Sequence, residues 1–335
     1  MRAYSETLME AGESDAPTER PHRLYWWKEA LIAAVFYVVY SWTRNQFGSS
    51  QIAADGVPEQ AFTNAERLIR LESWMGLYHE QEVQSWFLEF RWFIQFWNTF
   101  YGTAHFFVTI GVFALLFFKR KDVFAQWRNT LAAMTALAII GFAFFPLMPP
   151  RLLDKPCPWP EEGMATQPGL HAVGSWGGEC IESDLRGEDG TFGFVDTLAE
   201  MGGPWSFDSE TVAEISNQYA AMPSLHIGWS TWCALAVWPL LRRRWTKAAV
   251  MLYPAATLFC IVVTANHYWI DGIGGIVVFV GGAAIGVGLH LWNQNRLDRA
   301  WQHRMAVAAA ATAAQPEPAV PEPHDTQTVS RSDAD

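Results

Sequence analysis

Basic residues are scarce in this chain of 335 residues. Lys and Arg number 23 against 34 Asp and Glu, which gives a formal net charge of −11 at pH 7. This balance provides no basic face for nucleic acid, so no nucleic-acid partner is expected. The acidic excess is concentrated between Pro149 and Pro223, where thirteen Asp or Glu residues accompany Arg151, Lys155 and Arg186.

Cysteine is also rare, with four residues in the chain. Cys233 and Cys260 fall within apolar stretches, where a free cysteine behaves as a small hydrophobic residue. Cys157 and Cys180 share the acidic segment. Their spacing leaves open whether they form a disulfide, a bond that is expected only outside the cytosol.

Charged residues are nearly missing from several long stretches, although half of all residues are hydrophobic and 18 are Trp. A helix needs about 20 apolar residues to cross the hydrocarbon core of a bilayer. The stretches therefore predict an integral membrane protein of the all-α class. We expect a six-helix bundle whose spans lie at residues 27–44, 92–118, 129–147, 224–241, 247–265 and 268–291.

The first of these stretches is short for a membrane span. Its apolar part, ALIAAVFYVVYSW, has Lys28 and Glu29 at its edge, so a buried or interfacial helix is an alternative. A cleaved signal peptide is not expected, because a long polar segment precedes the stretch and no small-residue cleavage site follows it.

Basic residues also predict the side of the membrane on which each loop lies, because short cytoplasmic loops collect Lys and Arg. They follow the second span in KRKDVFAQWR, the fourth in RRRWTK and the sixth at Arg296, Arg299 and Arg304. Both termini are therefore expected in the cytoplasm. The segments 45–91 and 148–223 are then expected on the extracytoplasmic side of the cell (plasma) membrane. The second of them is expected to form a long acidic loop.

The parts of the chain differ in composition. Residues 58–91 have apolar positions at helical spacing and charges on other faces, which predicts amphipathic helices at the outer surface. Residues 1–24 are polar and acidic, and residues 303–335 are rich in Ala and Pro, so both are predicted to be disordered cytoplasmic tails. One membrane domain is expected over residues 25–302.

The fourth span begins with the sequence MPSLH. Proline is favoured in the first helical turn, so Pro223 predicts a helix start. The backbone N–H groups around Ser224, Leu225 and His226 would then lack helical acceptors, and such a helix terminus attracts phosphate. The alternative is a simple helix start with a histidine at the membrane interface.

A second polar motif, TANHYWIDGIGG, precedes and enters the last span. His267 and Asp271 are four residues apart, which places them on one helical face within hydrogen-bonding reach. A carboxylate on one ring nitrogen leaves the other available as a nucleophile or base. An acidic residue inside a membrane helix is costly and usually functional, although a structural pair is the alternative.

Arg151 follows the third span in FPLMPPRLL. A guanidinium group matches phosphate oxygens well, and the alternative is an interfacial arginine that reaches the lipid headgroups. The predicted topology puts Arg151, Ser224, His226, His267 and Asp271 at the same membrane face. A site for phosphoryl transfer needs this combination of an anion-binding group, a nucleophile with an orienting acid, and a second acid or base.

These residues resemble a known family. PSLH, followed about forty residues later by HYWID, is similar to the paired motifs of the type-2 phosphatidic acid phosphatase superfamily. The phrases PPRLL, GFVDTL, AAMPSLH, ERLIRLESWMGLYHE and FWNTFYGTAHF resemble its inositol phosphorylceramide synthase-like (inositolphosphotransferase) branch. The resemblance covers roughly residues 60–290.

The resemblance implies a role for each residue of the site. His267 would attack phosphorus to form a phosphohistidine, with Asp271 orienting its ring. His226 would protonate the leaving alcohol and then activate the acceptor. Ser224 and Arg151 would hold the phosphate oxygens, and neither a metal nor another cofactor would be needed.

The chain departs from the common phosphatase motifs at two positions. The common first motif has a Lys before an Arg-Pro pair, whereas this chain has only PPR. The common third motif has an Arg six residues before the nucleophilic His, and Ile261 occupies that position here. The synthase-like branch shares both departures, so they argue against a simple phosphatase more than against phosphoryl transfer.

A polar stripe in the second span consists of Asn98, Tyr101 and His105, at positions i, i+3 and i+7. These side chains either line a substrate cavity or form hydrogen bonds with other helices. The glycines of DGIGGIVVFVGGAAIGVG predict close packing of the last span against its neighbours.

The expected function is that of a membrane lipid phosphatase or phospho-headgroup transferase, with a lipid donor and either water or an inositol-like polyol as acceptor. A transporter or lipid-binding protein with a His/Asp proton relay is an alternative, although no inverted repeat is evident. A metal site formed by His226, His267 and Asp271 is a third possibility. The oligomeric state is not predicted.

Overall fold

The computed structural model describes residues 25–32, 34, 35, 38, 57–155, 177–179, 181–202 and 218–313. Over these ranges the chain is helical, apart from turns and one isolated bridge between Leu147 and Ala220. The helices are α4 (Val57–Met75), α5 (Glu80–Ser85), α6 (Arg91–Lys119), α7 (Lys121–Phe144), η2 (Pro150–Leu152), α8 (Thr197–Glu200), α10 (Leu225–Val237), η3 (Trp238–Leu240), α11 (Arg244–Val263) and α12 (Trp269–Ala313).

Four of the described helices, α6, α7, α11 and α12, are long and apolar enough to cross a membrane. This confirms the prediction of an all-α membrane protein. The expected fourth span is a helix of 13 residues, α10, which continues into the short helix η3. The first expected span is described only in part, at 27–32, 34, 35 and 38. The six-helix bundle therefore stays a prediction.

Two helices extend beyond the predicted spans. The basic segment KRKDVFAQWR was expected as a loop, but α7 starts at Lys121, so Arg120 alone separates α6 from α7. Phe124 and Trp127 of that segment pack into the apolar core at helical spacing. The last helix continues through residues 303–313, which were assigned to the C-terminal tail, because its Ala-rich sequence has a high helix propensity.

Cys157 and Cys180, and hence their possible disulfide, lie outside the described residues.

Helix α10 lies against α6, α7 and α11. Its sequence, LHIGWSTWCALAV, is apolar on all sides, as expected of a helix that has neighbours all round. Trp232 is fully buried, and its indole Nε1 donates a hydrogen bond of 2.9 Å to the Trp127 carbonyl of α7. This packing fixes the position of the helix that carries His226.

Glycines bring α12 close to α7 and α10, as the sequence predicts. A Cβ atom on Gly282 would lie 2.5 Å from the Cβ atom of Met134, and one on Gly275 would lie 2.4 Å from the backbone oxygen of Ser224. Both distances are too short for two heavy atoms that are not bonded to each other. The glycines therefore set the distance between the helix that begins just after His267 and the helix that begins just before His226.

Substitution of Gly275 by Ala is expected to destabilise the protein by about 1–3 kcal/mol, because the added methyl group collides with the Ser224 backbone. The measurement is the midpoint of thermal unfolding in detergent. Gly288→Ala, in the same helix, is the matched control, because a Cβ atom there meets nothing within 4 Å. Equal midpoints for the two variants would contradict this account of the packing.

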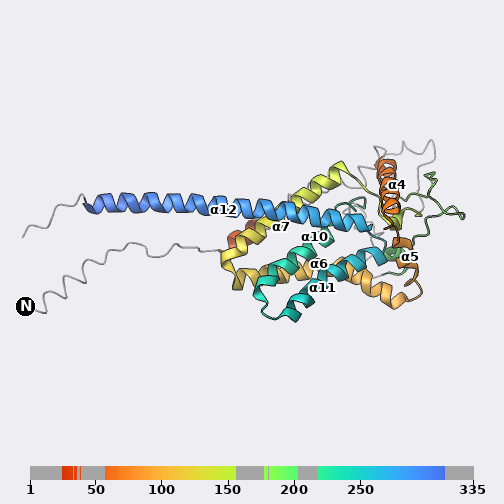
Figure 1. Ribbon diagram of the computed structural model, residues 1–335, viewed down its shortest axis with the longest axis horizontal. Helices are drawn as coiled ribbons and strands as arrows, with labels where there is room; N and C mark the ends of the chain where they lie inside the picture. The colour runs from red at the N-terminus through yellow and green to blue at the C-terminus, as the bar shows by residue number, and fades with distance from the viewer. Residues whose placement is uncertain are drawn as a thin grey trace, which may run out of the picture. The chain divides into compact units, whose positions relative to one another are not determined.

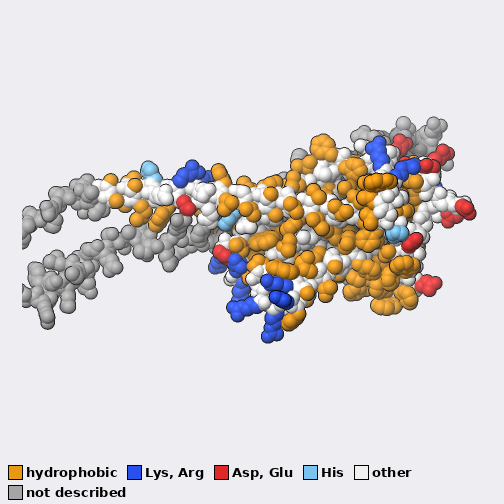
Figure 2. Space-filling view, in the orientation of Figure 1, with side chains coloured by type: hydrophobic (Ala, Val, Ile, Leu, Met, Phe, Trp, Pro, Cys, Tyr) orange, Lys and Arg blue, Asp and Glu red, His pale blue; other side chains and the backbone are white. Residues whose placement is uncertain are grey.

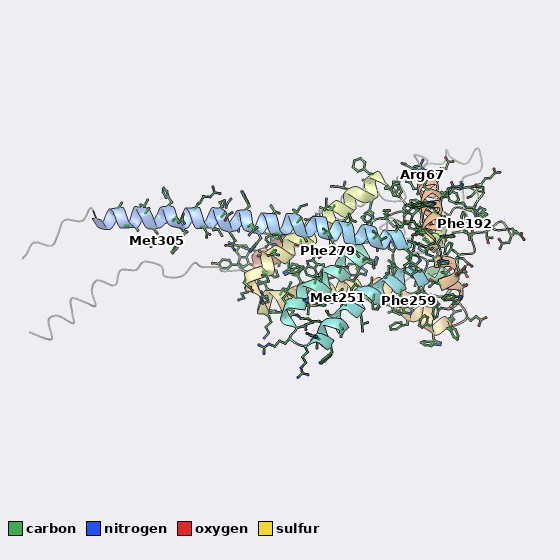
Figure 3. The ribbon with its side chains drawn as sticks, viewed as in Figure 1. Arg67, Phe192, Met251, Phe259, Phe279 and Met305 are labelled. Carbon is green, nitrogen blue, oxygen red and sulfur yellow. The ribbon has the colours of Figure 1, made fainter. Side chains whose placement is uncertain are left out.

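Helices α4 and α5 gather with the described part of the acidic segment at the end of the bundle where α12 begins (Figure 1). Gln84 of α5 joins the two, because its amide both donates to and accepts from the backbone of Val195 at 2.9 Å. Phe192 lies beside α4 (Figure 3), with its ring centroid 5.9 Å from that of Phe62. The cluster buried here includes Phe62, Ile69, Leu147, Leu152, Phe192, Phe194, Tyr219 and Tyr268.

Charge is distributed unevenly over the bundle. Figure 2 shows acidic side chains, with some basic ones among them, at the end with α4 and α5, hydrophobic side chains along the helices, and a group of basic side chains at the far ends of α10 and α11. Arg242 and Arg243, before α11, and Arg244, its first residue, are exposed. The bundle therefore has an acidic end and a basic end, separated by an apolar belt.

Candidate active site

His267 and Asp271 form a buried pair at the start of α12. The Nδ1 atom of His267 lies 3.2 Å from Oδ2 of Asp271, and the same carboxylate oxygen accepts the backbone N–H of Tyr268 at 3.0 Å. His267 is 3% exposed and Asp271 is fully buried. The carboxylate therefore faces Nδ1 of the imidazole, and Nε2 is the nitrogen available for chemistry.

Ser224 connects the two histidine motifs. Its backbone N–H donates to the Asp271 carbonyl at 3.0 Å, so this amide is not available to an anion as the sequence had suggested. Ser224 occupies the position before the first helical residue of α10, and Pro223 lies one residue outside the helix rather than in its first turn. The hydroxyl of Ser224 is buried and makes no hydrogen bond within the described part of the chain.

His226 lies in the first turn of α10 and faces His267. Their ring centroids are 5.7 Å apart. The ring of Tyr101 stacks on His226 at 4.3 Å, and the ring of His105 meets it edge-on at 4.6 Å. Two side chains of α6 therefore fix the orientation of the His226 imidazole.

A small cavity lies beside His226, with a volume of about 10 Å³. A volume of this size accommodates a single water molecule. Tyr101 and His105 both line it, and Asn98 does not. The full lining consists of Phe100, Tyr101, His105, His226, Tyr253, Thr257, Cys260 and Ile261.

Asn98 makes hydrogen bonds to the acidic segment instead. Its amide nitrogen donates to the carbonyls of Thr197 at 2.8 Å and Gly202 at 3.1 Å, and its oxygen accepts from the Thr197 hydroxyl at 3.1 Å. Of the two interpretations of this side chain, the geometry favours a hydrogen-bonding role between elements.

Arg151 is buried among polar partners near the histidines. Its Nε donates to the Asn266 side chain at 3.0 Å and its guanidinium to Asp196 at 2.9 Å, while its backbone N–H donates to Ala265 at 2.8 Å. Lys155 also donates to Asp196, at 3.0 Å. Ala265 has a positive φ of 52°, which costs a residue with a side chain about 1 kcal/mol. The turn before His267 is thus held by Arg151.

The Asp196 carboxylate is the counter-ion of this cationic group. Burial alone would raise the pKa of Asp196, but Arg151 and Lys155 outweigh it and hold this pKa below its ordinary value. The carboxylate also accepts the Ala199 N–H at the start of α8. Asp196 therefore stays ionised and holds Arg151 beside the histidine motifs.

Asp196, Lys155 and Asn266 had no assigned role in the sequence. Asp196 belongs to the phrase GFVDTL, which carried part of the family resemblance, so that phrase contained the signal. Asn266 lies in the motif TANHYWIDGIGG, directly before His267, but its relation to Arg151, like that of Lys155, depends on the fold. No group of three His, Cys, Asp or Glu side chains within the described ranges is arranged to hold a metal ion.

Together, the apolar helices and this site define a helical membrane protein whose histidines, aspartate and arginine gather at one end of the bundle. The family model of the PAP2 superfamily matches residues 66–285, about two thirds of the chain, so the chain belongs to the PAP2 superfamily. Members of this superfamily are phosphatases or other phosphoryl-transfer enzymes, which confirms the expected class of activity. Among curated proteins and solved structures, none matches this chain.

Proposed function

We propose that this protein is a membrane enzyme that takes a phosphoryl group or phospho-headgroup from a lipid and transfers it to water or to a polyol such as inositol. The contact between Nδ1 of His267 and the buried carboxylate of Asp271 is the observation that carries the proposal. It leaves Nε2 of His267 available, next to a second histidine on a helix N-terminus. A nucleophile, its orienting acid and a second acid or base are thereby within reach of one phosphoryl group.

The first half-reaction begins with attack on phosphorus by the Nε2 lone pair of His267. The P–N bond forms as the P–O bond to the lipid alcohol breaks, and His226 gives its proton to the departing oxygen. Asp271 stabilises the positive charge that develops on the His267 ring. This buried carboxylate makes no ion pair with Lys or Arg in the described structure, so its charge acts on the histidine without competition.

The second half-reaction reverses these roles. The acceptor hydroxyl gives its proton to His226, and its oxygen attacks the phosphohistidine as the P–N bond breaks. Stacking of Tyr101 on His226 supports this assignment, because one ring orientation then serves both proton transfers. Water as acceptor gives hydrolysis, and a polyol gives headgroup transfer.

Three groups are suited to hold the phosphate oxygens. The first-turn amides of α10 have no helical acceptors, the Ser224 hydroxyl has no partner among the described groups, and the Arg151 guanidinium is fixed beside the same motif. Ile261, at the position where the common phosphatases have an arginine, is fully buried in an apolar cluster. This cation is therefore absent from the site, as in the inositol phosphorylceramide synthase-like branch that we propose for the chain.

A lipid donor fits the charge of the protein. The described part of the acidic segment includes Glu179, Glu182, Asp184, Glu188 and Asp189 at the site end, and these residues repel a soluble phosphate ester. A substrate that enters from the bilayer avoids this barrier.

We also propose that the site faces the extracytoplasmic side of the plasma membrane. The exposed arginines of the α10–α11 turn lie at the opposite end of the bundle and are typical of a cytoplasmic loop. Exposed Trp74, Trp86 and Trp92 near the site end are typical of a membrane–water interface.

Purified protein is expected to release the lipid alcohol from a phospho-headgroup lipid and to transfer the headgroup to an added acceptor. The measurement is mass spectrometry of lipid products from a panel of lipid phosphates and phospho-headgroup lipids, with and without inositol. His290→Ala is the control for general effects of histidine loss, because His290 lies on α12 outside the site. Rapid release of phosphate from soluble esters, with none from lipids, would contradict the proposal.

A further inference from the structure

Two glutamates from outside the bundle reach the backbone at the start of α12. Glu72 of α4 accepts the N–H of Ile270 at 2.8 Å, and Glu80 of α5 accepts the N–H of Trp269 at 3.1 Å. Both glutamates are fully buried. Trp269 follows His267 by two residues, so α4 and α5 hold the part of the chain that carries the proposed nucleophile.

The second oxygen of each carboxyl group has no hydrogen-bond donor. Oε2 of Glu72 and Oε2 of Glu80 are both buried and without a partner in the described structure. The two side chains are within hydrogen-bonding reach of each other. Burial, followed by the hydrogen bond and charge of Glu80, raises the pKa of Glu72 to about 10. One proton shared by the two carboxyl groups provides the donor that they lack, whereas two buried carboxylates would repel each other.

Among the described residues, no cation acts on Glu72 that could replace this proton. The titratable groups that face it are Asp271 of α12, Tyr78 in the turn between α4 and α5, and Tyr268 before α12. Asp271 is itself acidic, and burial raises the pKa of Tyr78, so neither provides a positive charge. A single carboxylate would be enough to cap a helix, so capping alone does not explain why two are buried here.

We propose that Glu72 and Glu80 share one proton and together position the first turn of α12, so that the His267–Asp271 pair keeps its reactive geometry only while this proton is present. They are positioning residues, since they act through the backbone of α12. Only the effect of the shared proton on catalysis rests on the proposed function. The shared proton itself is testable without any substrate.

The direction of the pH effect follows from the raised pKa of Glu72. A carboxyl group with a higher pKa in the folded state contributes stability that is fully present below its unfolded value of 4.5 and is lost as the pH rises towards about 10. Glu72→Gln replaces the shared proton with an amide N–H that does not titrate. This variant should therefore lose less stability than the wild type as the pH rises from 6 to 10.

The experiment measures two quantities from pH 6 to 10 for full-length protein in detergent: the midpoint of thermal unfolding, and kcat and KM on a lipid donor. We expect Glu72→Gln to flatten the fall of the unfolding midpoint and to extend the alkaline limit of kcat by roughly one pH unit, with little change in KM. Glu80→Gln should behave in the same way, since its amide can donate to Glu72. Glu72→Ala should lower kcat at every pH.

The control variant is Glu82→Gln, which changes a 60% exposed glutamate on the same short helix α5. It should leave both pH profiles unchanged. If Glu72→Gln gave the wild-type unfolding profile, the shared proton would be wrong whether or not the protein is an enzyme. If the unfolding profile flattened while the kcat profile stayed that of the wild type, the positioning role would be wrong. Absence of turnover in the wild type as well as in every variant, with a flattened unfolding profile for Glu72→Gln, would instead contradict the proposed function.

Discussion

Replacement of His267 by Ala is expected to reduce turnover of a lipid donor by roughly 10⁴-fold or more, because the proposed covalent route then has no nucleophile. His267 is 3% exposed, and within the described residues the hydrogen-bonding contact of its ring joins Nδ1 to the Asp271 carboxylate. The backbone contacts that hold this turn, such as the Arg151 N–H bond to Ala265, do not involve the imidazole. The variant is therefore expected to fold. The measurement is kcat on a lipid donor, with the unfolding midpoint recorded on the same samples.

Two controls separate loss of the nucleophile from general damage. His290→Ala removes a histidine from α12 outside the site and should keep wild-type turnover. His267→Gln restores side-chain volume and should stay as inactive as His267→Ala, because an amide nitrogen is not a nucleophile. Turnover of His267→Ala within tenfold of the wild type would show that another group attacks phosphorus.

Replacement of Arg151 by Gln is expected to lower kcat/KM by about 10²–10³-fold, because a fixed cation beside the reacting phosphate is lost. It is also expected to lower the free energy of unfolding. Asp196, buried with only 7% of its side chain exposed, would keep Lys155 as its remaining cationic partner among the described residues. Breaking one partner of a buried ion pair costs about 3–5 kcal/mol, so activity must be expressed per folded molecule.

The double variant Arg151→Gln/Asp196→Asn distinguishes binding from folding. It removes both charges of the pair, and Asn can still accept the Ala199 N–H at the start of α8. Stability should recover in large part, and activity should not. Arg186→Gln is the matched control, because Arg186 pairs with Asp154 at 3.0 Å and contacts none of the proposed catalytic residues. Recovery of activity in the double variant would show that Arg151 serves only to hold Asp196.

Local spacing predicted the parts of the site that lie close together in the chain. The four-residue separation of His267 and Asp271 predicted their contact, but the expected helical geometry was wrong, because His267 lies two residues before the start of α12. The apolar stretches predicted the helices that bring MPSLH and HYWID to the same end of the bundle. The roles of these residues remain predictions, whereas the superfamily is confirmed by the family model.

Contacts between distant segments were not predictable from spacing. Asp196 and Asn266 lie 45 and 115 residues from Arg151, and no periodicity relates them to it. The sequence placed Glu72 and Glu80 on the charged faces of the amphipathic helices predicted for the outer surface. Helical spacing shows that a helix has two faces, but it does not show that the charged face meets the backbone of α12.

The residues at which helices begin and end were the least predictable part of the fold. Hydropathy sets where a span is apolar, but a helix continues beyond it wherever the next residues also favour helix. For this reason α7 includes the basic segment from Lys121, and α12 includes residues 303–313. Likewise, the position of Ser224 at a helix start predicted that its backbone N–H would be free to bind an anion, but this N–H donates to the Asp271 carbonyl.

The central claim is that the phosphoryl group or phospho-headgroup is carried by His267. Its most direct test is to mix the purified protein with a lipid donor labelled on phosphorus, quench within one turnover, and locate the label by peptide mass spectrometry. We expect an acid-labile, base-stable adduct on the peptide that contains His267, and no adduct in His267→Ala. An adduct on another residue, or steady turnover without any adduct on the wild-type protein, would contradict the account.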